Sequence, residues 1–313
     1  MGQKVFHITN GSNLTDYLKD LSFEGDFLSW QEMLCEGPTE SLIDTSSFTQ
    51  KRKEFLNEFY DIELNEAEYM SEIHKLNNLE GYSEIVLWFE YDLFCHINLL
   101  AVISLLRQKS VTKPLSLVCS GRIPGEKNLK GLAELTSEQL SLHYSTREKL
   151  REEDIDLAIS VWDIYCGKDH NLLKDYITKK STFKYLTNCL KAHLERFPNQ
   201  KSGLDKLEEN ILTIVRDNHI KSRNHLLGYA LNYQGYYGYG DLQLLRIIDK
   251  LSIFFTEEPE RLSLNRKGHE ALLLQHNFSV EIDNNIPYGG VNRFDFQFST
   301  KQNKLIKTVI NAY

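Results

Sequence analysis

The sequence predicts an α/β fold: a Rossmann-like, mainly parallel sheet in residues 1–170, then a second, mostly helical, winged-helix-like domain in residues 171–313. Residues 85–89 form an apolar, β-favouring run that ends in Glu90 and Asp92 and leads directly into a long apolar helix pattern. This is typical of a buried parallel strand that feeds a helix. In the second part, three helix patterns precede short strand-like pieces, which is the element order of a winged helix.

The composition is that of an ordinary globular protein, with 41% hydrophobic and 26% charged residues in 313, a length typical of two domains. No apolar run approaches the roughly 20 residues that cross a bilayer, so no membrane contact is expected. The N-terminus lacks the charged stretch and apolar core of a signal peptide. The five cysteines are widely spaced, without a Cys-x-x-Cys pair, and indicate reduced thiols in a cytoplasmic protein.

The charge is distributed unevenly along the chain. Residues 1–100 carry six lysines and arginines against 19 aspartates and glutamates, whereas the remainder carries 30 against 25. An acidic first part repels phosphate backbones, which argues against nucleic acid as a partner.

The first predicted unit is a strand at residues 5–9, a turn at 10–13 and a helix at 14–21. A glycine-containing turn between a strand and a helix aims backbone N–H groups at an anion. The single glycine makes neither a Walker loop nor a dinucleotide fingerprint, so a plain tight turn with Ser12 or Asn13 as N-cap is the alternative. The candidate ligand-binding residues of this unit are His7, Asn10, Gly11 and Ser12.

A second short strand is predicted at residues 27–30, ending in Trp30. Glu32 and Glu36 follow it, and Gly37-Pro38 closes the turn. Each carboxylate is a candidate for the same sheet edge, with a solvated loop as the alternative. The polar helical stretch that follows contains one basic triplet, in which Arg52 could act as an anion clamp or lie on a solvated helix face.

The central strand ends in the most acidic part of the predicted edge. Asp92 is placed to cap the following helix, residues 93–108, and Glu90 lies on the same strand face. His96 is one helical turn after Asp92, so the two could share a metal or a proton, although a structural pair is the simpler interpretation. A further strand is predicted at residues 115–119.

The second part follows helix patterns at residues 136–142 and 146–166, with the domain boundary near 165–180. Its own patterns predict three helices and two strand-like pieces, and the Tyr/Gly tract between the second and third helix patterns is expected to be a loop. These segments are helices at 185–197, 204–216 and 241–255, a loop at 228–240, and strand-like pieces at 278–282 and 291–298. The balanced charges of the third helix do not suit a DNA-reading face.

Three separated motifs resemble, in the same order, the signature of a bacterial domain-of-unknown-function family: His7-Ile8-Thr9-Asn10-Gly11-Ser12, then Trp30 with Glu36-Gly37-Pro38, then Leu87-Trp88-Phe89-Glu90-Tyr91-Asp92-Leu93-Phe94. The chain departs from that family's pattern at Ser12, Glu32 and Cys95-His96, where the family has Asp, Asp and Asp-Gln. The family often carries a smaller C-terminal domain, which the segments at 193–198, 203–204, 240–241, 264–268 and 288–290 resemble. The resemblance implies this two-part architecture, and it implies no reaction, because none is assigned to the family.

Two classes of function fit these patterns. The first is a sensing or regulatory protein that binds a small polar or phosphorylated, nucleotide-like ligand at the carboxyl edge of the sheet and docks a protein partner through its C-terminal domain. The alternative is a metal- or acid/base-dependent hydrolase or transferase acting on a phosphorylated small molecule. The sequence contains no nucleophile motif and no metal-spacing motif, so no metal ligands are assigned and the cofactor is left open.

Overall fold

The computed structural model describes residues 4–308. Its central element is a five-stranded sheet in the order β2-β1-β4-β5-β6. The first four strands are parallel and β6 runs antiparallel to β5, which confirms the predicted mainly parallel sheet. The strands are β1 (Lys4–Asn10), β2 (Asp26–Trp30), β4 (Tyr82–Phe89), β5 (Leu115–Cys119) and β6 (Glu148–Lys149).

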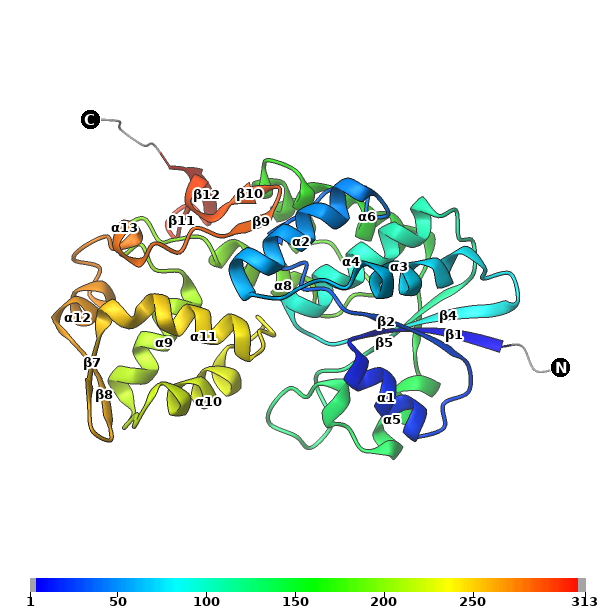
Figure 1. The fold of residues 1–313 in the computed structure, drawn as a ribbon, viewed down its shortest axis with the longest axis horizontal. Helices are drawn as coiled ribbons and strands as arrows, with labels where there is room; N and C mark the ends of the chain where they lie inside the picture. The colour runs from blue at the N-terminus through cyan, green and yellow to red at the C-terminus, as the bar shows by residue number, and fades with distance from the viewer. Residues whose placement is uncertain (1–3, 309–313) are drawn as a thin grey trace.

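Helices cover both faces of this sheet (Figure 1). Alternate residues of β4 explain why: Leu87 and Phe89 belong to one buried cluster together with most of α4, while Val86 and Trp88 belong to another together with Leu14 of α1. A strand buried on both faces is therefore continuously apolar. One face carries α1 (Ser12–Asp20) and α5 (Ser137–Ser145). The other carries α2 (Ser46–Tyr60), α3 (Glu66–His74), α4 (Leu93–Gln108) and α6 (Glu152–Cys166).

The strand order reverses between β1 and β4. The chain passes from β1 through α1 outward to β2, returns through α2 and α3 to β4, and then continues through α4 to β5 on the opposite side. In open α/β sheets, ligands bind at the carboxyl ends of the strands near such a reversal.

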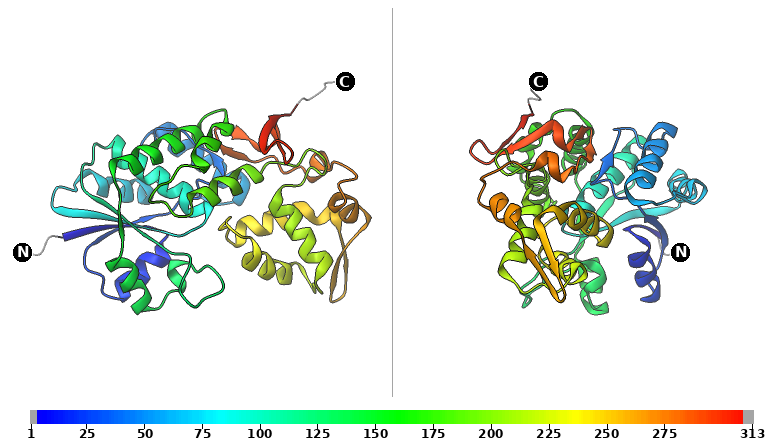
Figure 2. Two further views of the ribbon diagram at one scale, coloured as in Figure 1. Left: turned by 180° about the vertical axis from the view of Figure 1, so that it is seen from behind. Right: turned by 60° about the vertical axis from the view of Figure 1, so that its left-hand side comes forward.

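After α6 the chain is mostly helical until residue 282. We call the part from α9 to α13 the helical module; it stands beside the sheet (Figures 1 and 2). Ile220, between α9 and α10, forms an isolated bridge to Leu262 of the β7–β8 hairpin. The elements are α7 (Lys174–Ile177), α8 (Leu186–Glu195), α9 (Lys206–Asp217), α10 (Arg223–Tyr233), α11 (Asp241–Lys250), β7 (Phe255–Glu258), β8 (Arg261–Leu264), α12 (Arg266–Leu272) and α13 (Ser279–Ile282).

The last strands return the chain to the sheet part. β9 (Pro287–Gly289) pairs in parallel with β3 (Gly37–Pro38), and one buried cluster joins Phe55 of α2 to Phe197 and Tyr288. The parts before and after residue 170 therefore share a core. The remaining elements are β10 (Val291–Asn292), β11 (Phe296–Ser299), β12 (Lys304–Lys307), η1 (Lys75–Asn77), η2 (Leu132–Glu134), η3 (His170–Leu173), η4 (Leu251–Phe254) and η5 (Arg293–Asp295).

Several local predictions were wrong for identifiable reasons. The strand-like piece at 278–282 is helix α13, because the Asn277 side chain accepts the Ser279 N–H and starts a helical turn. The predicted 228–240 loop contains the second half of α10, which Ser222 caps. The helix predicted from residue 146 begins at Glu152, because β6 first adds an edge strand to β5. Within residues 4–308, no helix combines the length and the apolar character needed to cross a membrane.

Candidate functional site

A pocket of about 570 Å³ opens at the carboxyl ends of β1 and β2. We call it the edge pocket. Residues 10–13 at the start of α1 form one wall, residues 28–33 at the end of β2 form a second, and the α2–α3 connection with α3 forms the third. Its lining residues are Asn10, Gly11, Ser12, Asn13, Leu28, Ser29, Trp30, Gln31, Glu32, Met33, Leu56, Ile62, Glu63, Leu64, Asn65, Glu68, Tyr69, Glu72, Ile73 and Phe94.

The N-terminus of α1 belongs to this pocket. Gly11 is the N-cap, with a φ of 98°, and its N–H donates to the Trp30 carbonyl at 2.9 Å. A glycine offers no side-chain oxygen, so among the described residues no side chain caps this helix. The first N–H groups of a helix carry a partial positive charge, and here they are left for a ligand or for solvent. The predicted N-cap role of Ser12 or Asn13 is wrong, because both already lie inside the helix.

Four polar atoms in the walls of the edge pocket are buried and find no hydrogen-bond partner within residues 4–308. They are Ser29 Oγ, Trp30 Nε1, Glu32 Oε1 and Tyr69 Oη. Trp30 and Glu32 are only 2% and 5% exposed. A buried polar atom without a partner costs about 1–3 kcal/mol, and native structures contain few of them. All four atoms belong to residues that line this one pocket.

Arg52 lies behind Glu32 and not in the pocket wall. Its side chain is fully buried, and its Nε donates to Glu32 Oε2 at 3.1 Å. The same guanidinium donates to the carbonyls of Met33 at 3.2 Å and Glu36 at 2.7 Å. Arg52 therefore holds the 31–38 segment in place and neutralises Glu32. Because its guanidinium binds these protein groups, it does not serve as the predicted anion clamp.

Asn10 connects the edge pocket to α4. Its Nδ2 donates to Cys95 Sγ at 3.1 Å, and its Oδ1 accepts from Asn98 Nδ2 at 2.8 Å. Asn98 also donates to the Glu32 carbonyl at 2.6 Å and accepts the Leu34 N–H. Sequence reasoning missed Asn98, although it is an amide side chain in the middle of an apolar helix. It also missed Ser29 and Tyr69, which no sequence pattern indicated.

Glu90 and Asp92 form a second, neighbouring group at the end of β4. Glu90 accepts the Leu132 N–H at 2.5 Å, and Asp92 accepts the Cys95 N–H at 2.8 Å as the N-cap of α4. Their carboxylate oxygens and Cys95 Sγ lie within 4.8 Å of one another. Burial, and then the charge of Glu90, raises the pKa of Asp92 to about 7, and burial also raises the pKa of Glu90.

His96 does not contact the Asp92 carboxylate. Its Nδ1 lies 3.0 Å from the Asp92 backbone carbonyl, the normal helical partner one turn earlier. Burial lowers the pKa of His96 to about 4, so the ring is neutral near pH 7. The contact between the two residues therefore runs through the backbone.

The end of β4 is covered by the helical module. The N–H groups of Leu93 and Phe94, at the start of α4, donate to the carbonyls of Tyr236 and Tyr237 at 2.7 and 3.2 Å. Gly238 lies so close that a Cβ there would be 2.1 Å from Asp92 Cγ. Residues 236–237 therefore accept the first N–H groups of α4, whereas no such segment covers the first N–H groups of α1 within residues 4–308.

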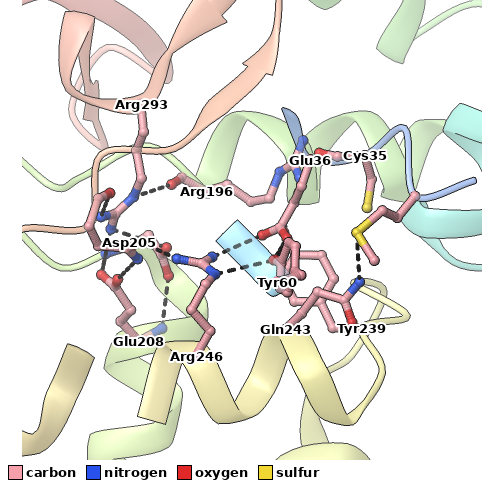
Figure 3. A network of polar contacts seen from close by, with 12 residues as sticks. Cys35, Glu36, Tyr60, Arg196, Asp205, Glu208, Tyr239, Gln243, Arg246 and Arg293 are labelled. Atoms are coloured by element: carbon pink, nitrogen blue, oxygen red, sulfur yellow. Dashed lines mark hydrogen bonds and ion pairs between the residues drawn. The ribbon is translucent and has the colours of Figure 1, made fainter. Parts of the chain in front are cut away.

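The two remaining predicted residues lie elsewhere. His7 is buried on the α1 and α5 face, where Nδ1 accepts from Trp88 Nε1 at 3.1 Å and Nε2 lies 3.2 Å from the Glu24 carbonyl. Burial lowers the pKa of His7. Glu36 is fully buried and binds Tyr60 and Arg246, as Figure 3 shows. The structure thus brings Asn10, Gly11, Ser12, Trp30 and Glu32 together, with Glu90 and Asp92 as neighbours.

A scan of the chain against models of known protein families finds no match, and a search among curated proteins finds none either. The resemblance to a bacterial family therefore stays a prediction, and function is argued from the site alone.

Proposed function

We propose that this protein binds a small phosphorylated, nucleotide-like ligand in the edge pocket and that the helical module responds to its presence. The observation that carries the proposal is the combination of an uncapped α1 N-terminus with Trp30 and Glu32, two buried side chains that each present an unpartnered polar atom. Helix N-termini bind phosphate through their free N–H groups and their dipole.

The negative charge of the pocket walls limits the number of phosphate groups that a ligand can carry. Among the residues described, no lysine or arginine lines the edge pocket, whereas Glu63, Glu68 and Glu72 do. Like charges at close range disfavour binding, so a polyphosphate would be repelled unless a divalent cation accompanied it. A ligand with a single phosphate, or one bound together with Mg²⁺, suits these walls best.

The 31–38 segment supplies a route from the pocket to the helical module. At one end Glu32 lines the pocket. Next to it, Gln243 Nε2 of α11 lies 3.7 Å from Met33 Sδ, and further along the segment Arg246 of α11 forms an ion pair with Glu36 at 3.2 Å. A ligand that contacts Glu32 would therefore act on a segment that α11 also holds, which supports a sensing role.

The helical module resembles a winged helix in its element order: α9, the bridging Ile220, α10, α11 and the β7–β8 hairpin. In that arrangement α11 would be the recognition helix. Here Gln243 and Arg246 of α11 face the sheet part. This favours a protein partner over nucleic acid for the module, because the helix that would read DNA is already engaged.

The proposal is tested by thermal denaturation of the full chain against nucleoside monophosphates, nucleoside polyphosphates and phosphosugars, with and without Mg²⁺. A ligand that binds only the folded state stabilises it by RT ln(1 + [L]/Kd), about 2.7 kcal/mol at a hundredfold excess over Kd. We expect a clear rise in melting temperature for at least one single-phosphate ligand. A flat screen under both conditions contradicts a phosphate site.

A second candidate, an acid/base enzyme, is favoured by the carboxyl pair at the end of β4. A group with a pKa near 7 is suited to donate and accept protons at neutral pH, and the pKa of Asp92 is raised to about 7. The test is to incubate each ligand found in the screen with the wild-type chain and with Asp92→Asn and to follow its conversion. Turnover that Asp92→Asn abolishes, with binding retained, would establish this function.

A further inference from the structure

We infer that the edge pocket is specific for a ribose-bearing monophosphate, and that Glu32 recognises the vicinal hydroxyl groups of the sugar. This inference rests on the proposed function and names its ligand class.

The first support is the place of Glu32 in the fold. It lies two residues after the end of β2 and 21 residues after Gly11 at the start of α1. In parallel α/β nucleotide sites, the phosphate lies at the helix after the first strand. A carboxylate about 20 residues further on, at the end of the second strand, accepts hydrogen bonds from the ribose. The edge pocket contains both positions although the glycine-rich fingerprint is absent.

The second support is the state of the Glu32 carboxylate. Oε2 is engaged by Arg52 at 3.1 Å and by the Met33 N–H at 3.3 Å. Oε1 has no partner within residues 4–308, although the residue is only 5% exposed. A carboxylate oxygen is purely an acceptor, so in the proposed complex Oε1 would accept a hydrogen bond from the ligand. A hydroxyl group supplies one, whereas a phosphate dianion supplies none and is repelled.

The geometry of the other walls accommodates the rest of such a ligand. The α1 N-terminus offers donors for one phosphate, and Trp30 Nε1 offers a further unused donor. Ile62, Leu64 and Phe94 are partly exposed and supply apolar surface on which a base could lie. Hydroxyl groups, one phosphate and an apolar face thus each have a counterpart, and Glu32 is the group that separates a ribose from other phosphorylated compounds.

The experiment is titration calorimetry of the full chain, with and without Mg²⁺. The probes are the four ribonucleoside 5′-monophosphates, their 2′-deoxy counterparts, ribose 5-phosphate and inorganic phosphate. A site built to hydrogen-bond a hydroxyl group rejects the analogue that lacks it. We expect at least one ribonucleotide to bind tenfold or more tightly than its 2′-deoxy form. Glu32→Gln should reduce this ratio to near one, since the amide presents a donor where the hydroxyl needs an acceptor.

The matched control is Glu68→Gln, which makes the same chemical change at an exposed residue of the same pocket and should leave the ratio intact. Equal binding of ribo and deoxy forms by the wild-type chain overturns the inference and leaves the proposed phosphate site standing. Absence of binding by every probe overturns both. If Glu32→Gln fails to fold, because Arg52 loses its charged partner, the wild-type comparison decides alone.

Discussion

Asp92 has two structural roles that act on stability in opposite directions. As N-cap it accepts the Cys95 N–H, which stabilises α4. As a buried carboxylate beside Glu90 it is held in a place that disfavours its charge, which raises its pKa from 3.8 to about 7. Asparagine caps a helix about as well as aspartate but carries no charge, so Asp92→Asn separates the two roles.

The first prediction concerns the pH dependence of this variant. Because the folded pKa of Asp92 lies above the unfolded value, the folded state binds the proton more tightly, and stability falls as pH rises from about 4 to about 7. Asp92→Asn removes this loss. We therefore expect the gain in stability of the variant over the wild type to be larger at pH 8 than at pH 5, as measured by urea denaturation at both pH values.

Comparison of the two proteins isolates Asp92 from buried histidines such as His96 and His170, whose lowered pKa values act in the opposite direction. Asp169→Asn is the control, since Asp169 also caps a helix but is exposed, and it should show no such pH-dependent gain. Asp92→Ala should cost about 1 kcal/mol through loss of the cap. Equal stability of Asp92→Asn and the wild type at both pH values would leave capping as the only role.

At this scale the sequence predicted local roles better than distant ones. The cap role of Asp92 is confirmed because it depends on residues three positions away. The role of Arg52 could not be predicted, because Lys51 and Lys53 beside it are exposed while Arg52 turns inward to Glu32, 20 residues earlier. The sequence of three consecutive basic residues does not indicate which of them is buried against a carboxylate.

At the scale of elements, the same substitution should have opposite effects in two helices. Gly11 is the N-cap of α1 with a φ of 98°, and Gly228 lies inside α10. At neither position would an added Cβ meet another atom within 4 Å, so each change acts through the backbone alone. Gly11→Ala places a side chain on an extended, positive-φ conformation that essentially only glycine adopts and should destabilise by about 1–3 kcal/mol. Gly228→Ala should stabilise by about 0.5–1 kcal/mol.

Denaturant unfolding of the two variants beside the wild type gives both signs in one experiment. A stabilising Gly11→Ala would show that the turn before α1 relaxes to negative φ, and the geometry of the uncapped helix end would then need revision. A destabilising Gly228→Ala would contradict the interior position of Gly228 in α10.

The sequence predicted those helices and strands whose own residue pattern determines them. It missed the strands that form only by pairing with a distant segment. The strands β1, β2, β4 and β5 follow from apolar runs between turns. Their parallel arrangement and the long α4 are confirmed, whereas their order, with β1 between β2 and β4, is not the order of the chain. β6 is two exposed residues that become a strand only by pairing with β5. The short strands β3 and β9 likewise exist through their pairing with each other, which no pattern within residues 37–38 indicates.

At the scale of the whole molecule, buried charges join the sheet part to the C-terminal part. Arg246 of α11 binds Glu36 and Tyr60 on one side and Asn284 at 2.5 Å on the other, and Asn284 donates to Glu208 of α9 at 2.9 Å. Figure 3 shows Glu36, Tyr60, Arg246 and Glu208 of this network. The edge pocket could be anticipated from strand ends, but this network could not, since its members lie up to 248 positions apart, from residue 36 to residue 284.

A double-mutant cycle on Glu36 and Arg246 tests how strongly this network couples the parts. Glu36 is fully buried, so Arg246→Met leaves an uncompensated charge and should cost about 3–5 kcal/mol. Glu36→Gln should cost less, because Arg246 is partly exposed and keeps Asn284. The double variant should be more stable than Arg246→Met alone, as measured by urea denaturation. Additive losses would show that the two side chains do not interact.

The sensing role makes a last prediction that also belongs to the whole molecule. If the 31–38 segment carries ligand occupancy to α11, filling the edge pocket with the ligand found by thermal screening should slow amide hydrogen exchange in α11 as well as in α1 and α3. Exchange reports the free energy of local opening, and α11 is held to the segment through Gln243 and Arg246. The β11–β12 hairpin, which packs against η3, is the internal control and should not change.

In Arg246→Gln, the ligand should still slow exchange in α1 and α3, while the slowing in α11 should be reduced. If the ligand slowed exchange only in α1 and α3 of the wild type, the pocket would bind its ligand without any effect on the helical module.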